Sequence, residues 1–116
     1  MDGEVQVGGV YSVARAEGYF GVVKVVAHQP ERNTIYARAF GPHFKVRPGA
    51  EWFKDRQPGK LDEELGIGIG VLPVTQRVFE FWQPELLFSQ AITEAEREDL
   101  GYCFGMAQPW DDLMYA

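Results

Sequence analysis

The chain has 116 residues, of which 46% are hydrophobic and 24% charged, and these proportions are typical of one soluble globular domain rather than a disordered chain. No apolar run approaches the roughly 20 residues that a membrane-spanning helix needs. The single cysteine excludes an internal disulfide and is typical of a reducing compartment. We therefore expect one cytoplasmic domain over residues 1–116, with flexible ends at about 1–7 and 108–116 and no membrane partner.

The formal net charge is −6, and the charge is unevenly distributed along the chain. Residues 1–60 hold nine basic and six acidic residues, whereas residues 61–116 hold two basic and eleven acidic residues. An acidic chain lacks the electropositive footprint of a nonspecific nucleic-acid binder, so we do not expect a nucleic-acid partner. The acidic second half either steers association with a basic protein or is a solvated face that only aids solubility.

The first forty residues predict an antiparallel meander of three strands, which are expected near residues 10–15, 20–27 and 34–40. The middle strand is densest in β-branched residues, and we expect it to be central and the most buried of the three. In the third strand Tyr36, Arg38 and Phe40 share one face, because side chains alternate along a strand.

The middle of the chain is less regular. Residues 41–66 are interrupted by glycine and proline and predict irregular structure that places Trp52 and Phe53 under the sheet. The run Gly66–Pro73 alternates glycine with aliphatic residues. This pattern lacks the spacing of a phosphate-binding loop and favours a strand against which another backbone or an aromatic ring packs.

The segment 76–82 has two interpretations. Its apolar spacing favours a short helix capped by Thr75, but a strand with alternating phenylalanines is also compatible. Leu86–Ser89 then predicts a further strand.

The last regular element is predicted by a capping box, with Thr93 as the N-cap and Glu96 three residues later. The helix is expected to end at about Leu100, with Gly101 as its C-terminal cap. The fold class that these elements predict is α+β. It has a curled antiparallel β-sheet, as in an SH3-like small barrel, followed by one or two short C-terminal helices.

Residues that could support catalysis are few. His28 and His43 lie in separate segments without metal-ligand spacing, and Cys103 stands between aromatic residues in a setting typical of a core. The carboxylates of residues 62–64 and 94–99 form runs, which usually make a solvated helix face rather than an acid–base pair. We expect no cofactor, no catalytic metal and no enzymatic activity.

The aromatic residues of the meander allow two uses. Together with nearby cations they could stack the bases of a single strand, or they fill the core, which we favour. The aromatic residues are Tyr11, Tyr19, Phe20, Tyr36 and Phe40, and the cations are Arg15, Lys24 and Arg38.

The pattern over residues 8–102 comprises Gly8–Val13, Gly18–Val25, a third strand ending in Phe40, Gly66–Thr75, Phe79, Trp82–Pro84, Leu86-Leu87, Ile92–Glu96 and Gly101-Tyr102. This pattern resembles the twenty-sixth immunity-protein family of bacterial polymorphic toxin systems. The resemblance implies a small α+β domain with a strongly bent sheet that binds and neutralises a cognate toxin. It carries over no functional residue position by position.

Two functions from different classes follow. The first is a non-enzymatic protein-binding module, with an immunity protein that neutralises a basic toxin domain as its sharpest form. The alternative is a small-barrel nucleic-acid-binding or regulatory module. For the first, the expected binding residues are acidic side chains with one aromatic anchor, namely Asp62, Glu63, Glu64, Glu94 and Glu98 with Tyr102 or Trp110.

Overall fold

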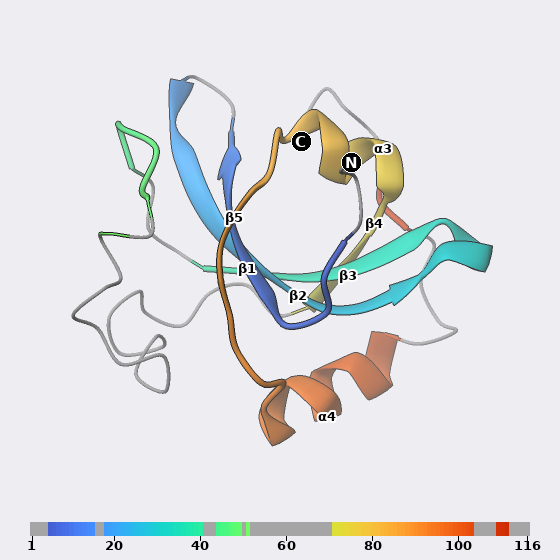
Figure 1. Cartoon of the computed structure of the whole chain (residues 1–116). Helices are drawn as coiled ribbons and strands as arrows, with labels where there is room; N and C mark the ends of the chain where they lie inside the picture. Colours follow the sequence, from blue (N-terminus) through green and yellow to red (C-terminus); the bar gives the residue numbers. More distant parts are fainter. Residues whose placement is uncertain are drawn as a thin grey trace.

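The computed structural model describes residues 5–15, 18–40, 44–49, 51, 71–103 and 109–111. Five antiparallel strands form one sheet in the order β4-β3-β2-β1-β5 (Figure 1). The strands are β1 (Gly9–Ala14), β2 (Phe20–Gln29), β3 (Thr34–Ala39), β4 (Val71–Thr75) and β5 (Glu85–Ser89). The helices are a 3-10 turn, η2 (Pro30–Arg32), and the α-helices α3 (Gln76–Phe81) and α4 (Glu94–Cys103).

The α+β class is therefore confirmed, together with an antiparallel sheet and two short C-terminal helices. Figure 1 shows that β1 and β2 bend strongly, so the sheet is curled. Among the described strands, β4 and β5 stand at the two edges and do not pair with each other. The sheet is not closed, so the SH3-like barrel is not confirmed.

The N-terminal meander is confirmed. β2 pairs with β1 on one side and with β3 on the other, as the pairs Val13↔Gly21 and Val25↔Ala37 show. Its residues from Gly21 to Val26 are all buried, which agrees with the central position expected from its β-branched composition.

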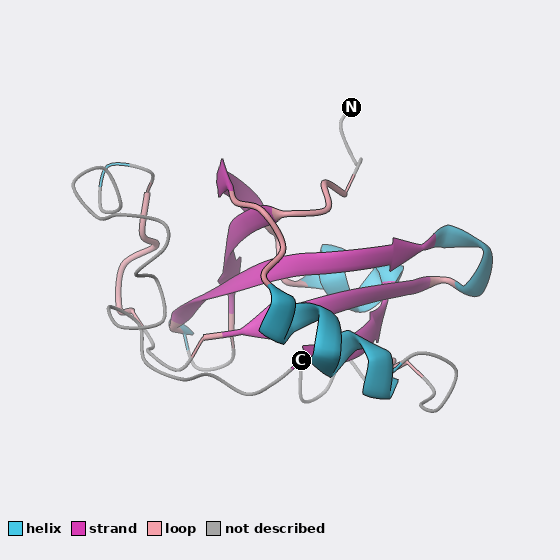
Figure 2. Ribbon diagram, turned by 90° about the horizontal axis from the view of Figure 1, so that it is seen from below, coloured by secondary structure: helices cyan, strands magenta, loops and turns pink. Residues whose placement is uncertain are grey.

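The sheet has two covered faces, and α3 and α4 lie on opposite ones (Figures 1 and 2). Ile35 and Ala37 contribute to the core beneath α3, as expected from the alternation of side chains along β3. Tyr36 lies on the other face, where it packs with Val26 and with Leu100 of α4. The sheet thus forms one layer between two helices.

The segment after β4 is a helix, so the strand interpretation is wrong. Thr75 caps α3 through its Oγ1, which accepts a hydrogen bond from the backbone N–H of Val78 at 3.4 Å. Phe79 packs edge-on against Tyr11 and Trp82, with ring centroids 5.3 and 6.3 Å apart respectively. The hydrophobic contacts of this face therefore hold a six-residue helix that is too short to be stable alone.

The capping box of α4 is present in full. The N–H of Glu96 donates to Thr93 Oγ1 at 3.1 Å, and the N–H of Thr93 donates to Glu96 Oε1 at 2.9 Å. The expected C-terminal cap at Gly101 is wrong, since α4 continues to Cys103. A glycine inside a helix costs only about 1 kcal/mol, and the buried Leu100 holds this part of the helix against the sheet.

Several predicted features lie outside the described residues. They include Trp52 and Phe53 in the irregular middle segment, the glycine alternation at 66–70, and most of the two chain ends. Within the described part of the chain, no helix is both long and apolar enough to cross a membrane.

Replacing the N-cap of α4 tests the capping box. We expect Thr93→Ala to destabilise the fold by about 1 kcal/mol, because it leaves the N–H of Glu96 without its acceptor. The urea denaturation midpoint measures the effect, and Thr93→Ser, which keeps the hydroxyl, serves as the matched control. Equal midpoints for Thr93→Ala and the wild type would contradict the expectation.

Candidate functional site

The attachment of α4 to the sheet depends on a buried carboxylate. Glu96 points from the first turn of α4 toward β2 and β3 and receives two charged partners there. Its Oε1 lies 2.8 Å from Lys24 Nζ, and its Oε2 lies 2.7 Å from Arg38 Nη1. The exposed side-chain fractions are 0% for Lys24, 2% for Glu96 and 15% for Arg38. We call these three residues the buried charge cluster.

The ammonium group of Lys24 has its full set of acceptors. It donates to Glu96 Oε1 at 2.8 Å, to the carbonyl oxygen of Ala91 at 2.7 Å and to Gln90 Oε1 at 3.0 Å. A lysine has three N–H donors, so each of them can be paired. Burying a charge is tolerated when it is both paired and hydrogen-bonded, and both conditions hold here.

The pKa of Glu96 reflects the same contacts. Burial acts to raise the pKa of this carboxyl group, but the hydrogen bonds from Lys24, from the backbone of Thr93 and from Arg38 together outweigh it. The pKa of Glu96 therefore lies below its ordinary value, and the carboxylate is ionised at neutral pH.

Two interpretations from the sequence are wrong at this point. Glu96 is not part of a solvated acidic face, and Lys24 is not available to contact a nucleic acid, because both are fully buried. A signal was present in the sequence: Lys24 is the only charged residue in an otherwise β-branched and apolar central strand. A charge at such a position requires a partner from elsewhere in the chain.

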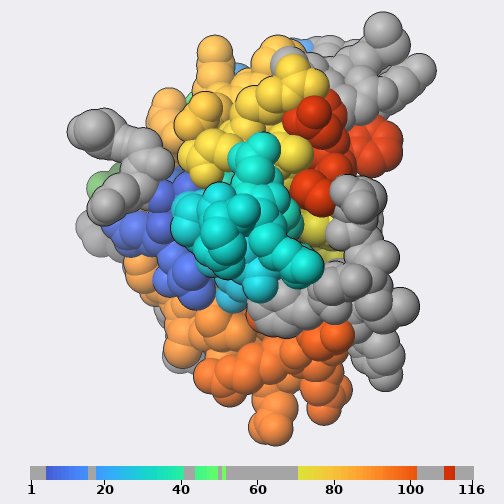
Figure 3. All heavy atoms as spheres, turned by 90° about the vertical axis from the view of Figure 1, so that its right-hand side faces the viewer, coloured from blue at the N-terminus to red at the C-terminus, as the bar shows by residue number. Residues whose placement is uncertain are grey.

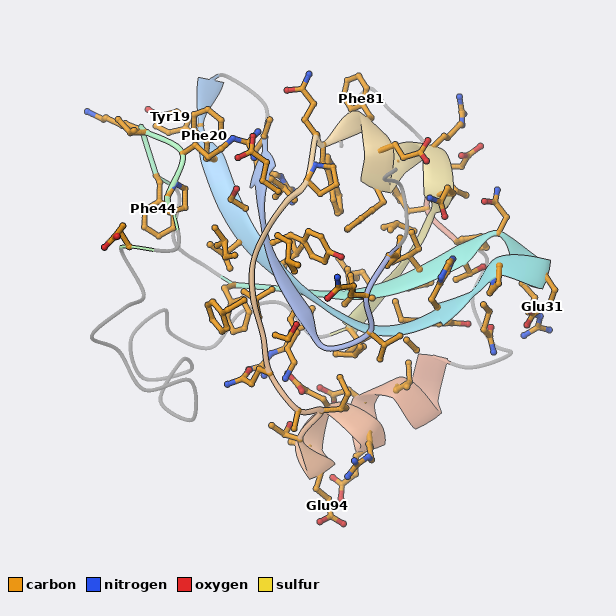
Figure 4. The ribbon with its side chains drawn as sticks, in the orientation of Figure 1. Tyr19, Phe20, Glu31, Phe44, Phe81 and Glu94 are labelled. Atoms are coloured by element: carbon orange, nitrogen blue, oxygen red, sulfur yellow. The ribbon has the colours of Figure 1, made fainter. Side chains whose placement is uncertain are left out.

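The outer face of α4 carries the exposed acidic residues. Glu94 and Glu98 are exposed and lie four residues apart, so they share a helix face. Figure 4 shows Glu94 pointing away from the sheet at the start of the helix. Asp99 is also exposed, with Arg97 as the one basic residue among them. We call Glu94, Glu98 and Asp99 the acidic face of α4.

The expected aromatic anchor Trp110 lies elsewhere. Its backbone pairs with the edge of β4. The N–H of Trp110 donates to Pro73 O at 2.8 Å, and the N–H of Thr75 donates to Trp110 O at 2.9 Å. The side chain is 48% exposed. Figure 3 shows residues 109–111 beside α3, whereas α4 forms the opposite end of that view. The structure therefore does not bring Trp110 next to Glu94.

Asp111 fixes this C-terminal segment to α3. Its Oδ1 lies 2.6 Å from Arg77 Nε and 2.6 Å from the Oγ1 of Thr75. These hydrogen bonds, Arg77 first, lower the pKa of Asp111 to about 2. The aspartate therefore has a structural use in this arrangement.

The structure does not describe the side chains of the other predicted binding residues. Tyr102 lies in the last turn of α4, of which the structure gives the backbone only. Asp62, Glu63 and Glu64 lie outside the described residues. Of the predicted binding residues, the structure therefore brings together Glu94 and Glu98, on the acidic face of α4.

The aromatic residues of the meander are mostly core residues. Tyr11, Tyr36 and Phe40 are buried, as the core interpretation expected. Phe20 is only partly buried and lies with Tyr19 and Phe44 at one end of the sheet (Figure 4).

Metal-ligating residues do not cluster in the described ranges, where no group of three or more His, Cys, Asp or Glu side chains could hold an ion. His28 is half-buried near the end of β2, and His43 lies outside these ranges.

A comparison of this chain with family models, curated proteins and solved structures finds no match. The resemblance to an immunity-protein family therefore stays an expectation from the sequence.

Removing the central carboxylate should be the most damaging single change at this site. We expect Glu96→Ala to destabilise the fold by about 3–5 kcal/mol, because it leaves the charge of Lys24 buried without its partner. Chemical denaturation measures the loss, and Glu98→Ala, on the exposed face of the same helix, should change stability by less than about 0.5 kcal/mol. The double variant Lys24→Met/Glu96→Leu should recover much of the loss, since neither charge remains. A small loss in Glu96→Ala would contradict the role assigned to the cluster.

The lowered pKa of Glu96 predicts how stability depends on pH. A carboxyl group whose pKa is lower in the folded state stabilises the fold above its unfolded-state pKa, and this contribution is lost as the pH falls through the folded-state value. We therefore expect the stability difference between the wild type and Glu96→Gln to be constant near neutral pH and to shrink in acid. Urea titrations from pH 7 to about pH 3 measure it. A difference that does not change with pH would contradict the expectation.

Proposed function

We propose that this chain is a non-enzymatic protein-binding module that presents the acidic face of α4 to a basic partner. The observation that carries the proposal is the buried charge cluster. Glu96 holds the first turn of α4 against β2 and β3 through contacts of 2.7 and 2.8 Å, while Glu94 and Glu98 on the same helix remain exposed.

Rigid presentation of charge is useful for recognition. A helix that is already capped and anchored loses little conformational freedom on binding, so less of the interaction energy is spent on ordering it. Charged groups on such a surface increase the association rate and orient the partner more than they raise the final affinity. The acidic face of α4 supports this mode, since its three acidic residues outnumber the one exposed arginine of the helix, Arg97.

The sharpest form of the proposal is an immunity protein that binds and neutralises a toxin domain in the cytoplasm. The acidic excess of residues 61–116 would complement a basic surface, such as the substrate cleft of a nuclease. The sequence resemblance supports this form. The curl of β1 and β2 supports the companion proposal that the sheet is a variant of the SH3-like small barrel.

The alternative of a small-barrel nucleic-acid-binding module has weaker support. Stacking of bases needs exposed aromatic rings, but Tyr11, Tyr36 and Phe40 are buried. The positive charges of Lys24 and Arg38 are directed to Glu96. We therefore prefer a protein partner.

Charge reversal on α4 tests the proposal. The wild type and Glu94→Lys/Glu98→Lys are used as baits in extract of the source cell, and the matched control is Glu31→Lys/Glu80→Lys. The control makes the same change in net charge at exposed positions outside α4, and Figure 4 shows Glu31 and Glu94 at different ends of the molecule. We expect a basic partner to bind the wild type and the control but not the α4 variant.

The association rate with the purified partner decides the outcome. We expect the α4 variant to associate more slowly than the control at low salt and to lose most of its salt dependence, because steering by the acidic face is removed. Equal rates for the two variants would exclude the acidic face as the binding surface. If the partner is a toxin, co-expression of the wild type should restore growth, and the α4 variant should restore it less.

A further inference from the structure

Arg15 is held in place by its surroundings. It follows β1, and its N–H donates to the carbonyl oxygen of Tyr19 at 2.8 Å, which closes the turn into β2. Its aliphatic stem crosses Gly21, where an added Cβ would lie 3.5 Å from Arg15 Cγ. Its guanidinium carbon lies 5.1 Å from the ring centroid of Trp82. A turn, a glycine and an aromatic ring together fix the direction of this side chain.

The guanidinium of Arg15 nevertheless has no hydrogen-bond acceptor or carboxylate in the described part of the chain. Arg47, which is also stacked on an aromatic ring, differs in this respect, because it donates to Ser12 and lies near Glu85. Arg15 is also half-buried, and burial lowers its pKa. It is therefore a partly desolvated cation that its neighbours hold in position and that no described carboxylate neutralises.

The ring beneath Arg15 carries a second unpaired donor. Trp82 is only 5% exposed, and its Nε1–H is the one buried side-chain donor in the described residues that has no hydrogen-bond partner. An unpaired buried N–H is costly, and it is uncommon in folded proteins for that reason. Because the Nε1 atom is itself closed to solvent, its N–H reports on the ring beneath Arg15 and is not a direct contact for a ligand.

We propose that Arg15, held over the indole ring of Trp82, forms a binding site for a carboxylate group of an acidic peptide or protein segment. A guanidinium presents two parallel N–H groups that match the two oxygens of a carboxylate. Stacking on an aromatic face leaves those in-plane donors directed outward. A carboxylate suits this site better than a phosphate dianion, because a single guanidinium balances one negative charge.

This site is separate from the acidic face of α4. Trp82 ends α3, and Figure 1 shows α3 and α4 on opposite faces of the sheet. The inference therefore goes beyond the proposed function, and either one can fail without the other. The two sites also have opposite charge, so they would bind different groups of a partner.

A titration with an acidic peptide tests the site. The probe is hexaglutamate with blocked ends, added to the isotope-labelled protein, and the readouts are the Arg15 Nε–H and Trp82 Nε1–H resonances in NMR spectra. Trp82→Phe assigns the indole signal. We expect both resonances to shift with saturation, and Arg15→Gln to weaken binding by about tenfold or more, as for a lost charge-assisted hydrogen bond. Arg15→Lys should retain only part of the affinity, because it keeps the charge but loses the planar pair of donors.

The control variant is Arg32→Gln, which removes an exposed arginine and should bind hexaglutamate like the wild type. Sodium chloride at equal ionic strength should not shift the two resonances to saturation. Equal affinities for Arg15→Gln and Arg32→Gln, or a shift of Arg15 without one of the indole, would overturn the proposal. Saturation by inorganic phosphate but not by hexaglutamate would overturn it as well, in favour of a phosphoryl ligand.

Discussion

The burial of one carboxylate constrains much of this structure. Glu96 neutralises Lys24 in the middle of the central strand, and Lys24 lies between Val22 and Val26 on the face that α4 covers. Without α4 that lysine would lose its counter-ion, and without the lysine the carboxylate would lose its most buried partner. The ion pair of Glu96 with Lys24 therefore holds the first turn of α4 on the sheet. The apolar contact of Leu100 holds the following part of the helix.

Glu96 also joins local to tertiary structure. The same Oε1 that accepts from Lys24 accepts from the N–H of Thr93, so the start of α4 and its position on the sheet depend on one atom. A capping box alone stabilises a helix without placing it, and an ion pair alone places a side chain without ordering the backbone. Their combination fixes the helix register, which is why Glu94 and Glu98 point outward.

Much of the fold could be predicted from the sequence, because its signals are local. The β-branched run of β2, the N-cap at Thr75 and the box at Thr93 each act within a few residues, and each is confirmed. The buried role of Glu96 was not predicted, since its sequence neighbours are charged and its partners lie 58 and 72 positions away. The predicted helix end at Gly101 was wrong for a similar reason. The low helix propensity of glycine was outweighed by the contact of the neighbouring Leu100 with the sheet.

The cations of the described residues differ in whether a carboxylate of the same chain pairs with them. Lys24 is buried and Arg38 partly buried, and both are paired with Glu96, so their charges are directed inward. Arg15 is oriented by its contacts with Gly21 and Trp82, yet its charge has no acceptor among the described residues. Ordering a long side chain costs conformational entropy, and within the described residues no salt bridge offsets that cost for Arg15. A ligand carboxylate would supply an interaction for this cation, whereas the exposed carboxylates of α4 are solvated and carry no comparable cost.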